Sequence, residues 1–161
     1  MLQLDVHESG EVSVHLPDES ATLELGARLA RCLPSQLIVY LRGQLGAGKT
    51  TLVRGVLRGL GYAGRVKSPT YTLVEVYRLS SLYLHHFDFY RFKDPNEWID
   101  AGFREMLGAD HVSLIEWPEK AGALLPAADL QLTLEYEEGG RRARLLASSP
   151  AGIECLRQLI T

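Results

Sequence analysis

The sequence contains only two cysteines, Cys32 and Cys155, among its 161 residues. Two thiols so far apart in the chain give neither the ligand spacing of a zinc site nor a disulfide framework. We therefore expect two inert thiols in a protein of a reducing compartment.

Long apolar runs are missing as well. No stretch of about 18 apolar residues occurs, and residues 1–8 lack the basic and apolar regions of a secretory signal. These absences argue against a membrane span and against secretion, and they predict a cytoplasmic protein. The 17 Lys and Arg residues are outnumbered by 20 Asp and Glu residues, which gives a net charge of −3. A negative chain has little non-specific affinity for nucleic acid, so we expect no DNA partner.

Internal repeats, low-complexity tracts and linkers are also absent from the sequence. The 161 residues suffice for one domain with a substantial core, and they are too few for two comfortable ones. We therefore predict a single domain that spans residues 1–161.

Residues 43–50 read Gly-Gln-Leu-Gly-Ala-Gly-Lys-Thr, an unbroken match to the phosphate-binding pattern G-x-x-x-x-G-K-[ST]. The glycines let backbone N–H groups turn towards phosphate oxygens, Lys49 neutralises the phosphates, and the Thr50 hydroxyl can ligate Mg²⁺. An apolar run at 36–41 precedes the motif, and apolar residues on one helical face follow it at 51–60. This order aims a helix N-terminus at an anion and predicts nucleotide binding. The predicted binding residues are Gly43, Gly46, Ala47, Gly48, Lys49, Thr50 and Thr51.

The remaining segments predict a mixed α/β fold. Two β-prone runs, 70–79 and 82–92, are joined only at Ser80 and Ser81, and so short a joint demands an antiparallel hairpin. Asp18 is a plausible helix cap, and Gly61 is expected to end the helix that follows the motif. The other expected elements are strands at 11–15, 36–42 and 112–116 and helices at 19–33, 95–107 (interrupted near Gly102) and 150–160. We predict a P-loop NTPase-like domain whose mixed sheet has a parallel core and antiparallel hairpins and is flanked by helices.

A second hairpin is predicted from residue 130, with Gly139 and Gly140 as a two-residue turn. In that register three pairs of opposite charge coincide, namely Glu138 with Arg141, Glu137 with Arg142 and Glu135 with Arg144. The three arginines are therefore interpreted as part of a solvated, ion-paired face and not as a nucleic-acid patch.

Two acids stand where strands deliver them to the sheet edge. Glu116 ends the apolar run at 112–116, and Asp88 lies in a β-prone run, where alternation places it with His86 on the face opposite Phe87 and Phe89. Either acid could serve phosphoryl chemistry, which needs Mg²⁺ and an oriented attacking oxygen. The alternatives are a salt bridge from Asp88 to an arginine and a solvated position for Glu116. His86 is interpreted as a structural hydrogen-bonding residue.

Two further features have a functional and a structural interpretation. Hydroxyl groups at 68–72, Ser68 and Thr70 among them, could sense a terminal phosphate, or the segment could be an ordinary lead-in to a strand. Gly55 and Gly59 lie inside the predicted helix at a cost of about 1 kcal/mol each relative to alanine. Close packing of a neighbouring element would account for them, and we favour it slightly over tolerated flexibility.

Taken together, four strings in this order resemble the TsaE family. They are GxxGAGKTT at 43–51, VKSPTYTLVE at 66–75, HFDxYR at 86–91 and EWP at 116–118. The first string is shared by many nucleotide-binding proteins, whereas the other three are specific. The resemblance extends from about Pro17 to the C-terminus.

The resemblance implies a bacterial ATPase, with ATP and Mg²⁺ as cofactors, that supports threonylcarbamoylation of adenosine-37 in tRNA. It implies that the protein drives the cycle of its TsaB and TsaD partners, of which TsaD transfers the group, and that tRNA is involved only indirectly. The roles it implies are Lys49, Asp88 and Glu116 in hydrolysis, Thr50 and Glu116 in Mg²⁺ binding, residues 68–72 as a switch-like loop and Glu19 near the nucleotide base.

Other functions remain open from the residues alone. The chain has no Asn-Lys-x-Asp guanine motif, which favours ATP over GTP, and it has no arginine-rich lid typical of a small-molecule kinase. A kinase and a nucleotide-dependent switch without required hydrolysis are the alternatives. No residue stands out as an arginine finger, with Arg91 the nearest candidate, so slow hydrolysis that partners accelerate is expected.

Overall fold

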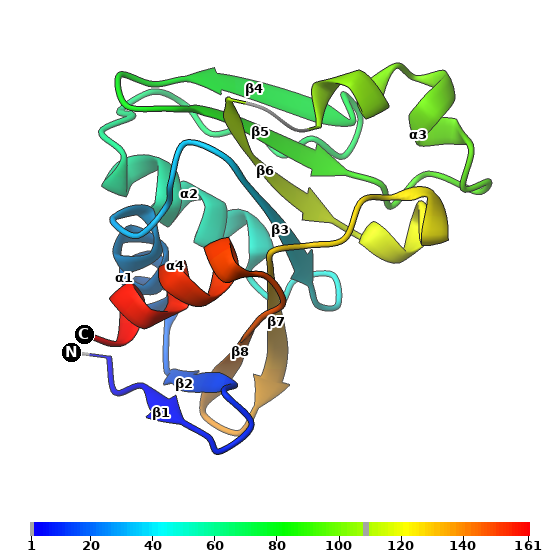
Figure 1. The fold of residues 1–161 in the computed structure, drawn as a ribbon. Helices are drawn as coiled ribbons and strands as arrows, with labels where there is room; N and C mark the ends of the chain where they lie inside the picture. The colour runs from blue at the N-terminus through cyan, green and yellow to red at the C-terminus, as the bar shows by residue number, and fades with distance from the viewer. Residues whose placement is uncertain (1, 108–109) are drawn as a thin grey trace.

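The computed structural model describes residues 2–107 and 110–161, which form one mixed α/β domain. Its centre is an eight-stranded sheet with the order β1-β2-β8-β7-β3-β6-β5-β4 (Figure 1). The strands are β1 (Asp5–Val6), β2 (Val12–Leu16), β3 (Leu37–Arg42), β4 (Val74–Arg78), β5 (Tyr83–Asp88), β6 (His111–Glu116), β7 (Leu130–Glu137) and β8 (Gly140–Ala147).

The sheet has a parallel centre and antiparallel sides. Strands β7, β3, β6 and β5 run parallel to their neighbours in this group, whereas β4 pairs antiparallel with β5. On the other side, β8, β2 and β1 continue the sheet in antiparallel pairs. The predicted fold class, including the hairpin formed by β4 and β5, is confirmed.

Helices cover both faces of the sheet. They are α1 (Glu19–Ala30), α2 (Lys49–Gly59), α3 (Glu97–Asp100) and α4 (Pro150–Ile160), with 3₁₀ turns at Phe103–Met106, Pro118–Lys120 and Gly122–Leu124. Asp18 caps α1 by accepting a hydrogen bond from Ala21 N at 2.9 Å, as predicted. Tyr62 N and Gly61 N donate to Leu57 O and Arg58 O, respectively, and this pattern ends α2 at Gly59, just before Gly61, which has a φ of +90°.

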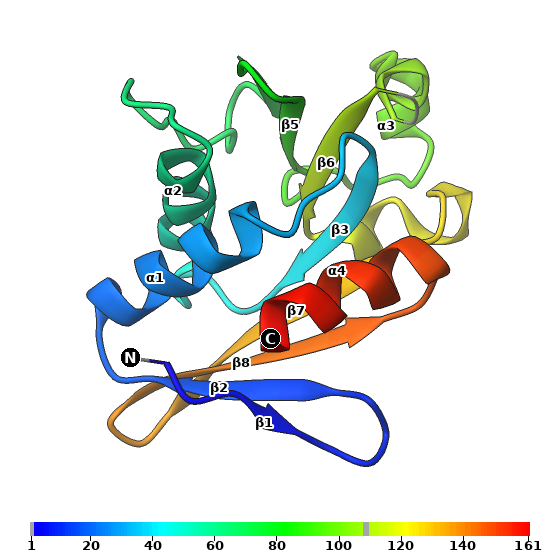
Figure 2. The same cartoon turned by 60° about the vertical axis from the view of Figure 1, so that its left-hand side comes forward.

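The core has two parts because side chains alternate along each strand. Leu37, Val39 and Leu41 of β3 face a large aliphatic core under α1, α2 and α4. Ile38 and Tyr40 face the opposite side, where an aromatic core gathers Phe87, Phe89, Phe92, Trp98 and Phe103. In the turned view of Figure 2, α1, α2 and α4 lie together and α3 lies apart from them. The second core fixes the region just beyond the end of β5.

Helices α1 and α2 are in backbone contact, and glycines make this possible. A Cβ atom at Gly55 would lie 2.4 Å from Leu23 O, and one at Gly26 would lie 2.5 Å from Leu52 O. At Gly59 a Cβ would come within 2.8 Å of the Ala30 Cβ. Close packing therefore explains the helix-interior glycines, as the sequence suggested.

The register predicted for the second hairpin is wrong by two residues. Glu137 pairs with Gly140, and Tyr136 pairs with Arg141, so the turn consists of Glu138 and Gly139. Gly140 is the first residue of β8, and a residue with a side chain would not fit there because a Cβ would lie 2.2 Å from Leu16 O of the neighbouring strand β2. The charge pairs did not determine the register, since long side chains also reach diagonal neighbours. Arg142 contacts Glu137 at 2.5 Å and Arg144 contacts Glu135 at 3.3 Å in this way.

Several predicted boundaries were too generous. The first helix ends at Ala30 and not at residue 33, and β5 ends at Asp88. Residues 70–73 form a turn before β4, in which Leu73 N donates to Pro69 O at 2.8 Å and Leu73 has a φ of +70°. The strand β1 was not predicted.

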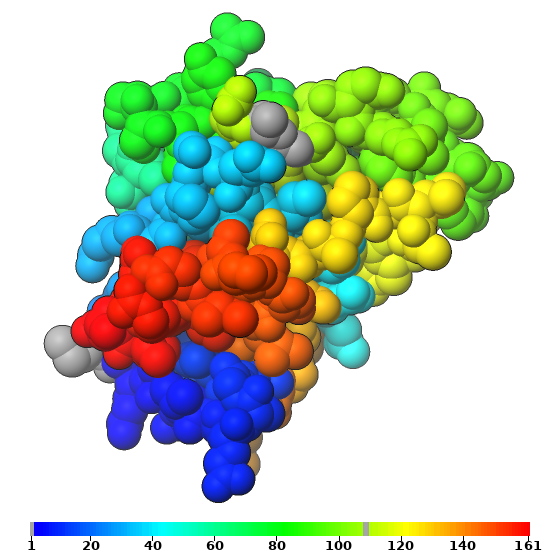
Figure 3. All heavy atoms as spheres, viewed as in Figure 1, coloured from blue at the N-terminus to red at the C-terminus, as the bar shows by residue number. Residues whose placement is uncertain are grey.

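The two chain ends share one face of the molecule. Figure 3 shows the C-terminal helix, in red, directly beside the N-terminal strands, in blue. Of the helices in the described part of the chain, none is long and apolar enough to cross a membrane.

The α1–α2 contact predicts the effect of Gly55→Ala. Alanine is the better helix former by about 1 kcal/mol. The added methyl group nevertheless meets Leu23 O, so we expect a net loss of about 1–3 kcal/mol in the free energy of unfolding. Denaturant titration measures this loss, and Arg58→Ala on the exposed side of α2 is the control, with an expected change within about 0.5 kcal/mol. A Gly55→Ala protein as stable as the wild type would contradict the close contact.

Candidate functional site

The 43–50 loop connects the end of β3 to the start of α2 through three glycines of positive φ. The φ values are +149° at Gly43, +81° at Gly46 and +107° at Gly48. Gly48 is the N-cap of α2, and no described side chain caps the helix there. The first N–H groups of α2 therefore remain available to an anion, which the helix dipole also favours.

Lys49 is the first residue of α2 and is only 5% exposed. Its Nζ donates a hydrogen bond to Gly43 O at 2.5 Å, lies 3.9 Å from Glu116 Oε1, and lies 4.2 Å from the centre of the Trp117 ring. Burial lowers the pKa of Lys49, and the nearby carboxylates of Glu116 and Asp88 oppose that effect. The ammonium group is thus held at the loop by a carbonyl, a carboxylate and an aromatic face.

Glu116 ends β6 and is 4% exposed, so the alternative of a solvated acid is wrong. It pairs in register with Leu41 of β3 on one side and with Asp88 of β5 on the other. Its Oε2 lies 2.5 Å from Nε2 of the fully buried His86, which donates to it. This contact agrees with the interpretation of His86 as a structural hydrogen-bonding residue.

Asp88 ends β5 beside Glu116 and is 5% exposed. Its Oδ1 accepts a hydrogen bond from Tyr90 N at 2.9 Å, and its Oδ2 accepts one from Thr70 Oγ1 at 3.4 Å. Within residues 2–107 and 110–161, no arginine forms a salt bridge with Asp88, so that alternative is wrong. Burial raises the pKa of Asp88, the Tyr90 N–H opposes this effect, and the charge of Glu116 adds to it.

Ser68 and Thr70 reach the same site from the turn before β4. Their hydroxyl groups are 2.8 Å apart, and Thr70 continues the connection to Asp88. Both residues line the cavity that contains Asp88 and Glu116. The switch-like role of these residues stays a prediction, but their position is next to both acids.

Two cavities flank the loop and share Gly46, Gly48 and Thr51. We call the cavity that contains Asp88 and Glu116 the acidic cavity. It has a volume of about 270 Å³ and is also lined by Leu45, Lys49, Thr50, Ser68, Thr70, Asp88, Glu116 and Trp117. We call the cavity beside the start of α1 the helix cavity. It has a volume of about 300 Å³ and is also lined by Leu16, Pro17, Asp18, Glu19, Thr22, Ala47, Gly140 and Arg141. Glu19 therefore lies at the loop, although on the side opposite the two strand-end acids.

Sequence reasoning missed two residues at the site, Tyr136 and Arg141. The Tyr136 hydroxyl donates to Leu45 O at 2.8 Å, and the Arg141 guanidinium lies 4.2 Å from the centre of the Tyr136 ring. The interpretation of Arg141 as a solvated partner of Glu138 is wrong, since the described residues include no such ion pair and Arg141 lines the helix cavity. No sequence signal could have identified Arg141, because the opposite charges of β7 and β8 fit more than one register.

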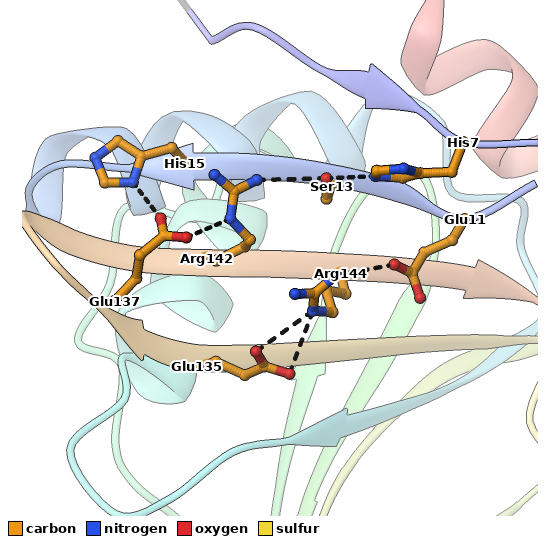
Figure 4. A network of polar contacts seen from close by, with 8 residues as sticks. All are labelled: His7, Glu11, Ser13, His15, Glu135, Glu137, Arg142 and Arg144. Atoms are coloured by element: carbon orange, nitrogen blue, oxygen red, sulfur yellow. Dashed lines mark hydrogen bonds and ion pairs between the residues drawn. The ribbon is translucent and has the colours of Figure 1, made fainter.

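Arg142 and Arg144 do lie on the ion-paired face that the sequence predicted. Figure 4 shows them between carboxylates of β7 and of Glu11, the residue before β2, with Arg142 bound to Glu137 and Arg144 bound to Glu11 and Glu135. Arg91 lies 4.2 Å from the centre of the Tyr71 ring, and it is not among the described residues that line either cavity.

Comparisons with known proteins match most of the chain. A family model described as "Threonylcarbamoyl adenosine biosynthesis protein TsaE" matches residues 16–144. The tRNA threonylcarbamoyladenosine biosynthesis protein TsaE of Haemophilus influenzae is 43% identical over 143 residues, which cover 86% of this chain and 90% of that protein. The protein of the same name from Synechocystis is 42% identical over 108 residues, which cover 65% and 69%. The crystal structure of Bacillus subtilis YdiB superposes with a TM-score of 0.80 over 99% of this chain and 95% of that chain; at 24% identity it shows a shared fold.

The buried carboxyl group of Asp88 predicts a gain in stability for Asp88→Asn. Because its pKa is raised, the ionised form destabilises the folded state at any pH above that value. We expect Asp88→Asn to raise the melting temperature at pH 7 by a few degrees. The gain should shrink as the pH falls through the raised pKa towards the ordinary value of 3.8, because the wild-type carboxyl group then carries a proton.

Thermal unfolding of both proteins between pH 4 and 8 measures this difference. Asp100→Asn, at an exposed position of α3, is the matched control and should leave the melting temperature unchanged. A lower melting temperature for Asp88→Asn at pH 7 would show that the carboxylate stabilises the fold.

Proposed function

This chain belongs to the TsaE family, and we propose that it is an ATPase that supports N6-threonylcarbamoyladenosine formation at position 37 of tRNA. In this proposal it acts in the cytoplasm on a complex of TsaB and TsaD and meets tRNA only through these partners. The observation that carries the proposal is the convergence of Lys49, Thr50, Asp88 and Glu116 on one cavity at the N-terminus of α2.

The donor set of the acidic cavity fits ATP with Mg²⁺. The N–H groups at the start of α2 and the ammonium group of Lys49 suit the phosphate chain. The described residues include no group of three or more His, Cys, Asp or Glu side chains that could hold a metal on their own. Mg²⁺ suits this set, because it is usually bound by one or two protein ligands together with phosphate oxygens and water. Thr50 and Glu116 are the residues that would hold it.

Each side chain then has a defined task in hydrolysis. When bound, Mg²⁺ neutralises charge that develops on the phosphate oxygens. Lys49 binds the same oxygens from the loop, and His86 holds Glu116 by its Oε2, which leaves Oε1 on the side of Lys49. Asp88 orients the attacking water and can accept its proton, a role that its raised pKa suits.

The dependence on partners follows from what the acidic cavity contains. Among its described lining residues, Lys49 is the one cation, and no arginine is aimed at it. Because an added arginine accelerates nucleotide hydrolysis strongly in other phosphate-loop enzymes, we propose slow hydrolysis by the isolated chain and faster hydrolysis with TsaB and TsaD. Ser68 and Thr70 would transmit the state of the site, since they connect Asp88 to the exposed turn before β4.

The decisive test is rescue of tRNA modification in bacteria depleted of their own TsaE. We expect the wild-type chain to restore threonylcarbamoyladenosine, measured by mass spectrometry of tRNA nucleosides, and we expect Lys49→Ala and Asp88→Asn to fail. Asp88→Asn should still bind ATP, with hydrolysis reduced by at least about 100-fold if Asp88 acts as general base. Lys93→Ala, which alters an exposed lysine, is the control and should rescue fully.

Three outcomes would count against parts of this proposal. Failure of the wild-type chain to restore the nucleoside would exclude the role in tRNA modification. Rescue by Asp88→Asn would favour a nucleotide-dependent switch without hydrolysis. Full ATP turnover by the isolated chain, indifferent to TsaB and TsaD, would exclude the coupling to partners.

A further inference from the structure

We propose that Arg141 is a nucleotide-binding residue that contacts the phosphate chain from the β7–β8 hairpin, on the side of the loop opposite Asp88 and Glu116. The inference rests on the proposed binding of ATP at the 43–50 loop. It adds to that site a second cation, supplied by a part of the chain that is remote in sequence from the loop.

The side on which Arg141 lies follows from the strand register. Leu134 and Ala143 are paired and are both buried in the aliphatic core, so their side of the hairpin faces inward. The pair of Tyr136 and Arg141 is the next one on the same side, because side chains alternate along a strand. This pair lies beyond the core, where the hairpin approaches the loop and the start of α1.

Two hydrogen bonds attach this pair to the loop. The Tyr136 hydroxyl donates to Leu45 O at 2.8 Å, and a Cβ at Gly46 would lie 2.8 Å from the same hydroxyl oxygen. The guanidinium group of Arg141 stacks on the Tyr136 ring, and its Nη2 donates to Gly46 O at 3.4 Å. Its Nη1 donates to Gly140 O at 3.0 Å. The guanidinium group is therefore held in place by an aromatic face and two carbonyl groups.

The charge distribution around the loop indicates what Arg141 binds. The helix cavity has two carboxylates, Asp18 and Glu19, and both have other partners, namely Ala21 N and Arg54. Arg141 is the one cation among the described residues that line this cavity, as Lys49 is in the acidic cavity. The two cavities share the backbone of Gly46 and Gly48. One cation thus lies on each side of the backbone that the phosphate motif predicts to bind phosphate, and guanidinium groups bind phosphate oxygens well.

The position of Arg141 also determines which step it affects. It lines the helix cavity and not the acidic cavity that holds Asp88, Glu116 and Thr70. Its contact is therefore expected to be with phosphates that ATP and ADP have in common. Loss of Arg141 should weaken both nucleotides equally and leave the turnover of bound ATP unchanged.

The test measures the affinity of Arg141→Ala for three probes: ADP, a non-hydrolysable ATP analogue and inorganic tripolyphosphate. We expect each affinity to fall about tenfold, the effect of losing one charge-assisted hydrogen bond. The kcat for ATP should stay within about twofold of the wild-type value. Arg141→Lys should recover part of the loss, because it keeps the charge but cannot stack on Tyr136 as a planar group.

Arg144→Ala is the matched control on the same strand, since Arg144 lies on the opposite side of the hairpin between Glu11 and Glu135 (Figure 4). It should leave all three affinities unchanged. Melting temperatures of all variants show whether a loss of binding reflects unfolding, and the graded response of Arg141→Lys separates binding from a general structural defect.

Each other outcome overturns the inference in a recognisable way. Equal ADP affinities for Arg141→Ala and the wild type would exclude the contact and leave the proposed function intact. A reduced kcat with unchanged ADP affinity would make Arg141 an arginine finger, and unchanged tripolyphosphate affinity would place its contact on the nucleoside. A wild-type chain that fails to bind any of the probes would overturn the proposed function and this inference together.

Discussion

The parallel alignment of β3, β6 and β5 is the constraint on which the site depends. Because the three strands run in one direction, their carboxyl ends meet at one edge of the sheet. The register places Leu41, Glu116 and Asp88 side by side, and the chain that leaves β3 continues directly into the 43–50 loop and α2. The course of the backbone therefore already brings the loop, its lysine and the two acids together. This is the location at which open α/β sheets generally bind ligands.

That alignment concentrates charged groups below the surface of the protein. Lys49, Asp88 and Glu116 are all buried, and their burial moves the pKa values of Lys49 and Asp88 in the direction that disfavours the charged forms. The hydrogen bonds from His86 to Glu116 and from Tyr90 N to Asp88 offset part of the cost. The aliphatic core below α1 and α2 and the aromatic core on the other face stabilise the framework that holds these groups. Buried charged groups that destabilise the folded state in this way are typical of binding and catalytic sites.

Much of this arrangement was predictable from the sequence because its signals are local. The Asp18 cap, the glycine motif, the short joint at Ser80 and Ser81, and the acid at the end of an apolar run each depend on neighbouring residues only. The end of the first helix at Ala30 and the turn before β4 were less predictable. The first stop signal after Ala30 is Pro34, which would allow the helix to continue to residue 33, and the positive φ of Leu73 is unusual for a residue with a side chain. Local preference does not decide such positions, because tertiary contacts override it.

The sequence by itself determined the glycine-rich 43–50 loop between a strand and a helix, the strands that carry Asp88 and Glu116, and membership of a family whose strings lie in this order. Only the tertiary structure decided which residues approach the loop from elsewhere. Opposite charges on β7 and β8 satisfy more than one register, since long side chains reach diagonal partners. The observed register pairs Glu137 with Gly140 and places Gly140 where a Cβ atom would lie 2.2 Å from Leu16 O of β2. In this register Arg141 lies opposite Tyr136 and not opposite Glu138, and its guanidinium group contacts the loop. Close backbone contacts tolerate only small changes of position, whereas attraction between exposed charges is compatible with several registers.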